Sequence, residues 1–384
     1  MDYPICNIYR RKNMKQQDKI KMLICGSTMN IGGVEKALLG LINTLDYSKY
    51  SVDLLLMSQE GEFMQYINKN VHILPTPSFF SWIVLPKNRV LNSLFSLIAK
   101  PHILYRFVKN IAYGVIMGNM VIARQRMWRD CIGYIPTLRG EYDIALDFSG
   151  LLRRYVLCKI DAKTRCTWIH SDYRVYGLDK GIDGPLLAEF DKICCVSKTC
   201  KTIFDNEYPT LQSRSCVKHN IIDTKFIMSR INEKGFDDGF NGVRLLDVTR
   251  IDPNKGLDIA VQVCSELKKK GLCFRWYILG NDPLGYKKEL VRLIKEYNVE
   301  DNFILLGFTN NPYPYMYEAD VIVHFSRFEG RSVAIDEALA LGKTILVTNY
   351  PTAKDQIEDG VNGYICDFNE KALTDKLFSI MKQL

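Results

Sequence analysis

Acidic residues are absent from one long part of this chain. Residues 76–129 contain no aspartate and no glutamate. They contain eight basic residues: Lys87, Arg89, Lys100, Arg106, Lys109, Arg124, Arg126 and Arg129. Large apolar side chains fill the same stretch: Phe79, Phe80, Trp82, Ile83, Leu94, Phe95, Leu97, Tyr105, Phe107 and Trp128. The longest uncharged apolar run, 111–123, is shorter than the ~20 residues that span a bilayer, which excludes a transmembrane helix here.

Two interpretations of residues 76–129 stay open. A basic, aromatic segment can lie in the interface of an anionic membrane, where each Lys or Arg near the surface contributes about 1 kcal/mol. The same residues can instead form helices that pack on a sheet and turn basic faces to solvent. Apolar residues are too dense in this segment for helical periodicity to decide between the two.

Other absences concern metals, disulfides and secretion. The 12 cysteines form no Cys-x-x-Cys pair, and no Asp-x-Asp stands at an expected strand end, so we expect no metal site. The first residues, MDYPICNIYRRKNMKQQDK, lack the continuous apolar stretch of a signal peptide. We therefore expect a cytoplasmic protein with free thiols, and a disordered N-terminal extension over residues 1–20.

The composition is that of a soluble globular protein with two domains. The chain has 384 residues, of which 47% are hydrophobic and 24% charged, and its net charge is +8. This is too long for one ordinary core and provides enough apolar residues for two. Because the excess of positive charge is modest and clustered with bulky apolar residues, binding of nucleic acid is the least favoured function.

Short apolar runs alternate with longer amphipathic ones along the whole chain. In the first half we expect strands at MLICGS, YSVDLLLM and VHILP, and at 142–148, 165–170, 192–197 and 215–222. A second series starts at Val243, with strands at VRLLDVTR, FRWYILG, NFILLGF, VIVHFS, TILVTN and GYICDF and with helices at 257–270 and 286–297 between them. Near-continuous apolar strands separated by helices predict parallel sheets covered on both faces.

The predicted fold class is therefore α/β, with two doubly wound Rossmann-like domains facing across a cleft. We place the N-terminal domain at 21–222, with the basic apolar insert at about 76–129, and the C-terminal domain at 243–384. The polar stretch 223–242 is the expected linker. Ligands of such folds bind beyond the carboxyl ends of the strands, so motifs at those ends are the candidate site.

Three strand-to-helix turns carry such motifs. The turn after the first strand contains Gly32 and Gly33, which let an anion approach free backbone N–H groups at a helix start. In the second domain Arg250 and Lys255 bracket one turn and can clamp a diphosphate. Each motif also has a plain structural interpretation, as a tight turn or as two solvated charges.

The segment VIVHFSRFEGRSVAIDEALALGKTILVTN, 321–349, is the third. Glu329 precedes a helix and Glu337 lies two turns along it, so the two carboxylates can accept hydrogen bonds from hydroxyls at opposite ends of one ligand. Gly330 permits close approach. The backbone N–H groups of Arg331, Ser332 and Val333 face a ligand at the helix N-terminus. Alternatively, Glu329 is a helix-capping acid and Glu337 a surface residue.

These motifs resemble the nucleotide-sugar domain of the retaining glycosyltransferases of family 4, which have the GT-B fold. The resemblance rests on Glu329-Gly-x6-Glu337 preceded by LLDVTRIDPNKG, YILG, ILLGFTNN and YMYEADVIVHFSRFEG, and it covers most of 243–368. In the first half it rests on GGVEKALLGLI and WIHSD. The enzymes it indicates are of the bacterial surface-polysaccharide or glycolipid type, such as those of capsule and lipopolysaccharide synthesis.

The resemblance implies a role for each matching residue. Glu329 would face the donor sugar and Glu337 would bind the ribose of the nucleotide. Arg250 and Lys255 would hold the diphosphate and stabilise the departing charge. Gly32 and Gly33 would form the loop near the phosphates, and His170 would contact the transferred sugar. Where many members have an aromatic residue and a glycine, Arg331 and Ser332 stand here, which leaves the donor sugar open.

The predicted function is retaining transfer of a sugar from a UDP- or GDP-linked donor to a hydroxyl, without metal or cofactor. If residues 76–129 lie on the inner face of the cell membrane, the acceptor is a lipid-linked saccharide; a soluble acceptor is the alternative. Two other classes remain. A nucleotide-sugar epimerase would use the same scaffold, and a non-catalytic binding protein would keep the fold without turnover.

Overall fold

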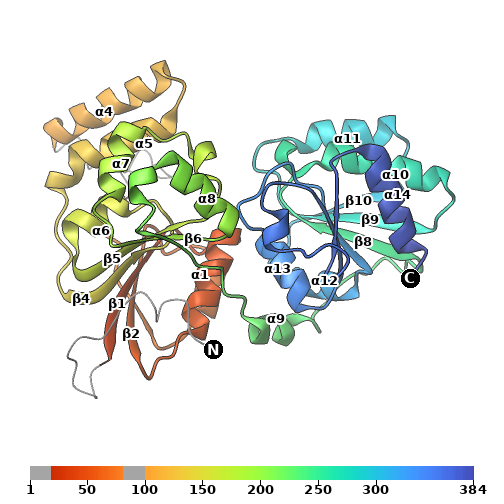
Figure 1. Cartoon of the computed structure of the whole chain (residues 1–384), viewed down its shortest axis with the longest axis horizontal. Helices are drawn as coiled ribbons and strands as arrows, with labels where there is room; N and C mark the ends of the chain where they lie inside the picture. Colours follow the sequence, from red (N-terminus) through yellow and green to blue (C-terminus); the bar gives the residue numbers. More distant parts are fainter. Residues whose placement is uncertain (1–18, 81–99) are drawn as a thin grey trace. The chain divides into compact units, whose positions relative to one another are not determined.

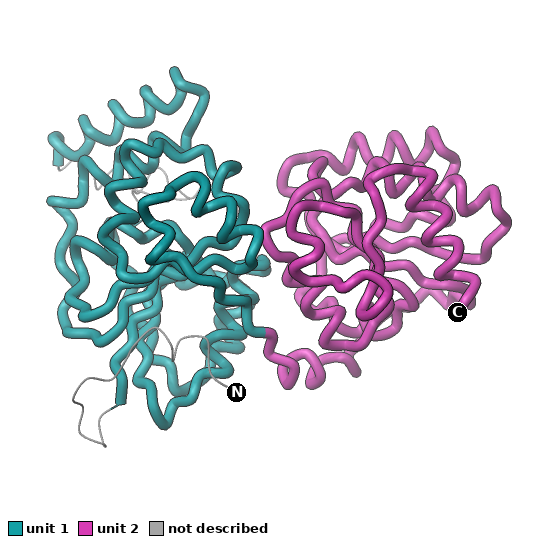
Figure 2. The backbone as a smooth tube through the Cα atoms, in the orientation of Figure 1, with its two compact units in different colours: residues 1–221 teal, residues 222–384 magenta. Residues whose placement is uncertain are grey.

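A computed structural model of the chain describes residues 19–80 and 100–384. The chain divides into two compact units, one ending at Ile221 and the other beginning at Ile222 (Figure 2). Each unit is a parallel β-sheet covered by helices (Figure 1). Most of the predicted N-terminal extension lies outside the described residues, as does part of the basic insert: Trp82, Ile83, Lys87, Arg89, Leu94, Phe95 and Leu97.

The described residues of the first unit form a seven-stranded sheet in the order β3-β2-β1-β4-β5-β6-β7, with every pairing parallel. Its strands are β1 (Ile20–Gly26), β2 (Tyr50–Leu56), β3 (Val71–Ile73), β4 (Glu141–Asp147), β5 (Asp161–Ile169), β6 (Lys192–Cys195) and β7 (Ser215–Val217). Its helices are α1 (Gly33–Thr44), α4 (Pro101–Ile116), α5 (Met120–Cys131), α6 (Arg153–Lys159), α7 (Lys180–Leu187) and α8 (Lys198–Glu207). The central strands are buried on both faces, as their apolar runs predict.

Helices α4 and α5 form a hairpin on the outside of the first unit, with α4 the outer of the two (Figure 1). The inner face of α4 packs Ile103 and Phe107 against Met127 and Cys131 of α5. Asn119 caps α5, because its side chain accepts hydrogen bonds from two backbone N–H groups of the first turn. Within 19–80 and 100–384, no helix combines the length and the apolar character needed to cross a bilayer.

Part of the aromatic content of the basic insert belongs to the core. Phe79, Phe80 and Trp128 are buried and their rings surround Tyr155 of α6, with centroids 5.3 to 6.5 Å from its ring. These three side chains therefore pack internally, as the second interpretation of the insert expects. The outer face of α4 is different and is taken up below.

The described residues of the second unit form a six-stranded parallel sheet in the order β10-β9-β8-β11-β12-β13. Its strands are β8 (Val243–Val248), β9 (Phe274–Leu279), β10 (Phe303–Gly307), β11 (Val321–His324), β12 (Thr344–Thr348) and β13 (Tyr364–Cys366). Its helices are α9 (Thr224–Arg230), α10 (Leu257–Lys269), α11 (Lys287–Glu296), α12 (Tyr313–Glu318), α13 (Val333–Ala340) and α14 (Glu370–Met381). Helix α9 lies in the predicted linker and packs against α12 and α13 of this unit.

The strand order reverses once in each sheet. In the first unit the chain runs outward from β1 through β2 and β3, then returns to pair β4 with β1. In the second unit β8, β9 and β10 run one way and β11, β12 and β13 the other, with β11 paired to β8. Because helices leave such a point toward opposite faces, the strand ends there are open to a ligand. The predicted motifs at Gly32, Arg250, Lys255 and Glu329 all follow strands of these two pairs.

Candidate active site in the second unit

Four ionisable side chains are linked at the carboxyl ends of β8 and β11: Asp247 and His324, which are buried, and Glu329 and Lys255, which are partly buried. Nδ1 of His324 lies 3.2 Å from Oδ1 of Asp247, and its Nε2 lies 2.8 Å from Oε1 of Glu329. The ammonium group of Lys255 forms an ion pair with the same Glu329 oxygen. Both ring nitrogens of His324 face carboxylate oxygens, which accept hydrogen bonds, so the ring donates twice and is an imidazolium.

The position of this cluster follows from the sheet. Strands β8 and β11 are neighbours, with Leu246 opposite Ile322, so Asp247 and His324 stand near the same end of adjacent strands. Both side chains are nearly inaccessible in strands that are otherwise apolar. A buried charge is costly unless it is paired. The pairing of Asp247 with His324 satisfies this requirement inside the sheet and presents the second imidazole nitrogen to Glu329.

The charges of the cluster are fixed by their neighbours. Burial alone would lower the pKa of His324, but hydrogen bonds and charges from Asp247 and Glu329 raise that pKa to about 9. Burial likewise favours the neutral acid of Glu329, yet Lys255 and His324 lower its pKa to about 2. Glu329 is therefore an anion at any physiological pH. It is compensated by two cations on one of its oxygens.

The second oxygen of Glu329 remains available to a ligand. Among the described residues, the hydrogen bonds to the Glu329 carboxylate come from His324 and Lys255, and Oε1 accepts both of them. A carboxylate held in this way can accept a hydrogen bond from a sugar hydroxyl through Oε2. Lys255, which is only 13% exposed in its side chain, has two further N–H groups that can donate to phosphate oxygens. One small region thus offers an acceptor for hydroxyls beside a donor for phosphates.

The loop that carries Glu329 is held against the loop that carries Lys255. The backbone N–H of Arg327 donates to the carbonyl of Asn254 at 2.8 Å, and the Arg327 guanidinium binds Asp258. Gly256 makes this approach possible: its φ is +63°, and a Cβ there would lie 2.0 Å from the Phe325 carbonyl oxygen. The Lys255–Glu329 ion pair therefore depends on Gly256, because only a residue without a Cβ lets these two backbone segments approach so closely.

Helix α13 places Glu337 in a buried position. Glu337 is 3% exposed, and its Oε1 accepts a hydrogen bond of 2.9 Å from the Tyr313 hydroxyl on α12. Tyr313 is itself buried, which raises its pKa well above the ordinary value, so it stays a donor. The surface position that was the plain alternative for Glu337 is thereby ruled out. Whether it binds a ribose stays a prediction.

Polar groups at the start of α13 already have hydrogen-bond partners within the second unit, which the sequence does not show. The Ser332 N–H donates to Oε1 of Gln356 at 2.9 Å, and the Gln356 amide donates back to the Ser332 carbonyl and to Asp336. Arg331 forms two 2.8 Å hydrogen bonds with Asp336 and a third contact with the carbonyl of Asp355. The Ser332 amide and the Arg331 side chain thus have partners within the unit. Val333 begins the helix and is buried.

Arg250 is the exposed cation of the candidate site. It follows β8, its side chain is 61% exposed, and its nearest carboxylate is that of Asp252 at 3.8 Å. Gly280 lies against the same turn, since a Cβ there would meet the Thr249 carbonyl oxygen at 1.7 Å. The Arg250 side chain therefore extends from a tightly packed turn, and its exposed guanidinium can bind an anion.

In the first unit, His170 follows β5 directly. Its Nε2 donates a hydrogen bond of 2.7 Å to the Phe148 carbonyl, and its ring stacks on Trp168 at 6.3 Å between centroids. Burial lowers the pKa of His170 to about 4, so the ring is neutral at pH 7. A neutral ring that donates through Nε2 carries a lone pair on Nδ1. His170 can therefore accept a hydrogen bond from a hydroxyl but cannot supply a positive charge.

Gly32 and Gly33 stand at the start of α1, as predicted. Gly32 is the N-cap residue, with extended backbone, and the Glu35 carboxylate folds over it: a Cβ on Gly32 would lie 2.3 Å from Oε2 of Glu35. Ser27 donates a hydrogen bond of 3.1 Å to the same carboxylate, and burial raises the Glu35 pKa. An anion at this helix end would meet the Glu35 side chain.

Sequence reasoning missed Asp247, His324 and Tyr313. A usable signal was present for the first two: each is a polar residue inside an apolar run, LLDV and VIVH, which a buried strand tolerates only with a partner. Tyr313 gave no signal, because an aromatic residue before a short helix is common. Within residues 19–80 and 100–384, no group of three or more His, Cys, Asp or Glu side chains is arranged to hold a metal ion.

Comparison with known proteins defines the class of the second unit. Residues 240–383 match the family model described as glycosyl transferases group 1. The second unit therefore carries a group 1 glycosyl transferase domain, and the resemblance to glycosyltransferases is confirmed. The narrower assignment to family 4 stays a prediction.

Individual relatives point the same way. Over 177 residues the chain is 29% identical to the N-acetylgalactosamine-N,N'-diacetylbacillosaminyl-diphospho-undecaprenol 4-alpha-N-acetylgalactosaminyltransferase of Campylobacter jejuni, covering 45% of this chain and 46% of that protein. It is 26% identical over 213 residues to the O-antigen biosynthesis glycosyltransferase WclY of Escherichia coli, covering 51% and 58%. The chain thus spans about half the length of the curated relatives that it matches.

A solved structure extends the likeness to the whole fold. The crystal structure of HepE from Anabaena, in complex with UDP and glucose, superposes with a TM-score of 0.65 at 17% identity and covers 94% of this chain and 89% of that one. The two parallel sheets with their helices are therefore the GT-B fold, as predicted.

Proposed function

We propose that this protein is a metal-independent, retaining glycosyltransferase that moves a sugar from a nucleoside-diphosphate sugar to a hydroxyl of a lipid-linked saccharide. It would act at the cytoplasmic face of the membrane in the assembly of a surface polysaccharide. One observation carries the proposal: Glu329, in a group 1 domain, has one oxygen saturated by His324 and Lys255 and the other available. An acceptor for sugar hydroxyls and a donor for phosphates are thus side by side.

The donor roles follow from these groups. Oε2 of Glu329 accepts a hydrogen bond from a hydroxyl of the donor sugar. Lys255 and Arg250 bind the diphosphate, the first as a partly buried point charge and the second as an exposed guanidinium. Glu337 binds the ribose. UDP is the first candidate nucleotide, since the similar HepE structure holds UDP, and GDP is the second.

The proposed sugar transfer depends mainly on the positive charges of Lys255 and Arg250. The bond from the anomeric carbon to the diphosphate breaks while the acceptor oxygen bonds to the same face, and the departing diphosphate takes the proton of the acceptor hydroxyl. Negative charge accumulates on the leaving oxygen, where Lys255 and Arg250 stabilise it, so the cations take the part that a metal ion plays elsewhere. The neutral ring of His170 accepts a hydrogen bond from the transferred sugar through Nδ1.

The lipid-linked acceptor is supported by the outer face of α4. Tyr105, Val108, Val115 and Ile116 are 56 to 82% exposed there, at spacings that put most of them on one side of the helix. Lys109 lies among them and is exposed too. A helix with this exterior is suited to an anionic membrane surface, into which its apolar side chains insert. An enzyme bound at the membrane surface reaches a lipid-linked acceptor that stays anchored in the same bilayer.

Transfer itself tests the proposal. The purified protein is incubated with UDP- and GDP-linked hexoses and N-acetylhexosamines and with lipid-linked saccharides, with and without EDTA, and the lipid fraction is analysed by mass spectrometry and NMR. We expect one donor to add one sugar to the lipid, unaffected by EDTA, with the anomeric configuration of the donor retained. Donor sugar epimerised without transfer would support the epimerase instead, and dependence on a divalent cation would contradict the metal-free clamp.

A further inference from the structure

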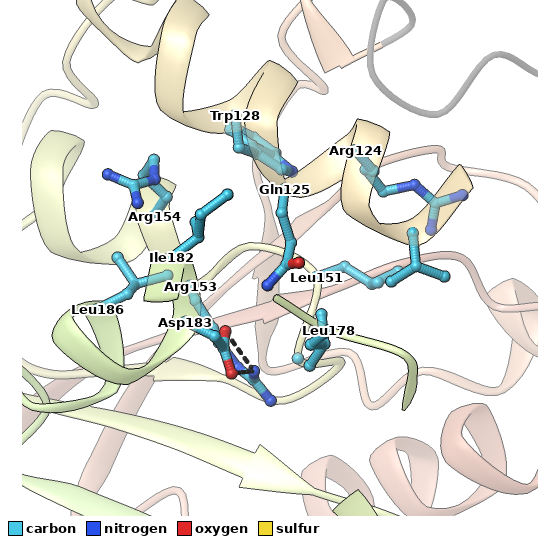
Figure 3. Close-up of a pocket in the computed structure, with 12 residues that line it drawn as sticks. Arg124, Gln125, Trp128, Leu151, Arg153, Arg154, Leu178, Ile182, Asp183 and Leu186 are labelled. Carbon is cyan, nitrogen blue, oxygen red and sulfur yellow. Dashed lines mark hydrogen bonds and ion pairs between the residues drawn. The ribbon is translucent and has the colours of Figure 1, made fainter. Parts of the chain in front are cut away.

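A pocket in the first unit lies outside the groups discussed so far. It is bordered by α5, by the start of α6 and by α7, and it is closed on one side by Leu151, in the loop after β4 (Figure 3). Its walls are mainly apolar, with Leu151, Leu178, Ile182 and Leu186 among them. The space measures about 510 Å³, including the part open to solvent. Because β4 is one of the two strands at which the sheet order reverses, the pocket lies near the expected ligand-binding edge of this unit.

Two buried donors in the pocket lining have no hydrogen-bond partner among the described residues. They are Nε1 of Trp128 and Nε2 of Gln125, from adjacent positions on one face of α5. Trp128 is only 6% exposed. The other end of the Gln125 amide is fixed, since its Oε1 accepts a hydrogen bond of 2.7 Å from the Asp179 N–H. In Figure 3 the nitrogen of this amide lies between Ile182 and Leu151. The indole N–H groups of Trp168 and Trp276 are unpaired as well, so an unpaired donor alone does not mark a site. The donors of Gln125 and Trp128 differ because both belong to the lining of one pocket, where an acceptor from outside the chain can reach them.

Two arginines complete the lining. Arg124 of α5 and Arg154 of α6 lie on opposite sides of the pocket in Figure 3, and neither makes an ion pair or hydrogen bond with a described residue. The carboxylate in the lining, Asp183, is already used by Arg153 and by the Tyr173 hydroxyl. Every polar group that the pocket leaves free is thus a donor, and two of them carry a positive charge. The complementary ligand is rich in acceptors and anionic, with an apolar part that fills the rest.

We propose that this pocket binds the phosphate or diphosphate ester of a long-chain alcohol. The Gln125 and Trp128 donors hydrogen-bond to the phosphate oxygens, and the leucine and isoleucine side chains receive the first part of the hydrocarbon chain. Arg124 and Arg154, on the two sides of the pocket, attract the anion by their charge. This deepens the proposed function, on which it rests for the identity of the lipid as the carrier of the acceptor saccharide. Helix α4 packs on α5 and has an exposed apolar exterior, so the pocket lies next to the face that is proposed to bind the membrane.

Binding of soluble analogues tests the pocket without vesicles. Farnesyl phosphate, farnesol and inorganic phosphate are titrated in turn into the full-length protein, followed by calorimetry and by tryptophan fluorescence. We expect saturable binding of farnesyl phosphate with a change in tryptophan emission, and binding at least about tenfold weaker for farnesol and for inorganic phosphate. Equal affinity for farnesol would overturn the role of the donors, and equal affinity for inorganic phosphate would overturn the role of the apolar walls.

Substitutions in the pocket lining test whether the proposed donors bind farnesyl phosphate. Arg124→Ala and Arg154→Ala remove side chains that make no hydrogen bond or ion pair with a described residue, so they should fold and should each weaken farnesyl phosphate binding about tenfold. Gln125→Glu keeps the acceptor for the Asp179 N–H but replaces the free donor by a charged oxygen, so it should abolish binding. Arg139→Ala removes an exposed arginine of the first unit that lies outside the lining; it is the matched control and should change nothing. A loss of equal size in the control would mean that general positive charge, and not the pocket, attracts the ligand.

The same samples separate this inference from the proposed function. If nucleotide fails to bind to the second unit while farnesyl phosphate binds to the first, the transferase proposal fails and the pocket stands. If nucleotide binds and farnesyl phosphate does not, the pocket fails and the transferase stands. The Lys255→Ala variant should lose nucleotide and keep farnesyl phosphate.

Discussion

His324 Nε2 lies 2.8 Å from Oε1 of Glu329, while Nδ1 of the same ring lies 3.2 Å from Asp247. One imidazolium thus links a carboxylate buried inside the sheet to the carboxylate at its edge. Glu329 is held as an anion in one orientation, which is the preorganisation that electrostatic catalysis requires. The following predictions test this cluster and the other features of the structure on which the proposed function depends.

Glu329→Gln keeps the shape of the side chain and removes its charge. We expect sugar transfer to fall about 10²- to 10³-fold, because the hydroxyl of the donor loses a charged acceptor and Lys255 loses its partner. The protein should also be less stable, by up to the about 3–5 kcal/mol that breaking a buried ion pair costs. Glu296→Gln on α11 is the control: that carboxylate is 55% exposed in a surface pair with Arg292, so transfer and stability should be unchanged.

His324 should make stability depend on pH. Its pKa is about 9 in the folded protein, above the ordinary 6.5 expected on unfolding, so the folded state binds more protons between these values. The stabilisation is complete below pH 6.5 and is lost as pH rises through 9, by up to about 3 kcal/mol. Urea unfolding at intervals from pH 6 to pH 10 measures it.

His324→Gln should remove most of that slope and lower stability at pH 6. His72→Gln is the control, because His72 is exposed on β3, and it should leave the pH profile unchanged. A wild-type free energy of unfolding that stays constant from pH 6.5 to 9 would mean that His324 is not an imidazolium.

Gly256→Ala should damage the site through the backbone. The residue has φ +63°, and the new Cβ would meet the Phe325 carbonyl, so either the turn at Lys255 or the end of β11 must shift. We expect a loss of more than about 1–3 kcal/mol in stability, with loss of transfer. Gly271→Ala is the matched control, with φ +74° but open space around it. It should cost about 1 kcal/mol and leave transfer intact; equal effects of the two substitutions would show that the contact with Phe325 is unimportant.

The outer face of α4 should determine membrane binding. In co-sedimentation with vesicles, we expect the wild type to bind anionic vesicles better than neutral ones. Val108→Ser, Val115→Ser and Ile116→Ser together should reduce binding at least about tenfold, because roughly 0.8 kcal/mol is lost per buried methylene. Leu284→Ser with Val361→Ser changes two exposed apolar residues of the second unit and should have no effect. If the control reduces binding as much as the triple variant, the α4 face is not the membrane surface.

Much of the fold could be predicted because its strands are buried on both faces. The helix expected at 257–270 is α10, Leu257–Lys269, and the one expected at 286–297 is α11, Lys287–Glu296. The strand expected at 215–222 is shorter, since β7 ends at Val217. The pairing with β6 stops at Val217, where the polar residues Lys218, His219 and Asn220 begin. The two isoleucines beyond them had extended the expected strand, and hydrophobicity alone does not show where a sheet ends.

The candidate site was predictable in part. Arg250, Lys255 and Glu329 stand out because charged residues in the turns after apolar strands are conspicuous. Glu337 stands out because it is a carboxylate on the helix between two apolar strands. The partners of these residues were not predictable: the link from Lys255 to Glu329 depends on how closely two loops approach across Gly256. The pairing of β8 with β11, which brings Asp247 to His324, is a property of the sheet order that no local pattern encodes.

The most direct test of the account is the thermal stability of the purified protein with UDP, GDP, ADP and CMP in turn, with and without EDTA. A ligand at a hundred times its dissociation constant adds about 2.7 kcal/mol to the stability of the folded state, enough to raise the melting temperature by several degrees. We predict that UDP or GDP stabilises the wild type and Arg292→Ala, whether or not EDTA is present, and that Arg250→Ala and Lys255→Ala lose the effect. No shift with any of the four nucleotides would contradict the account, because the second unit would then not bind the donor at all.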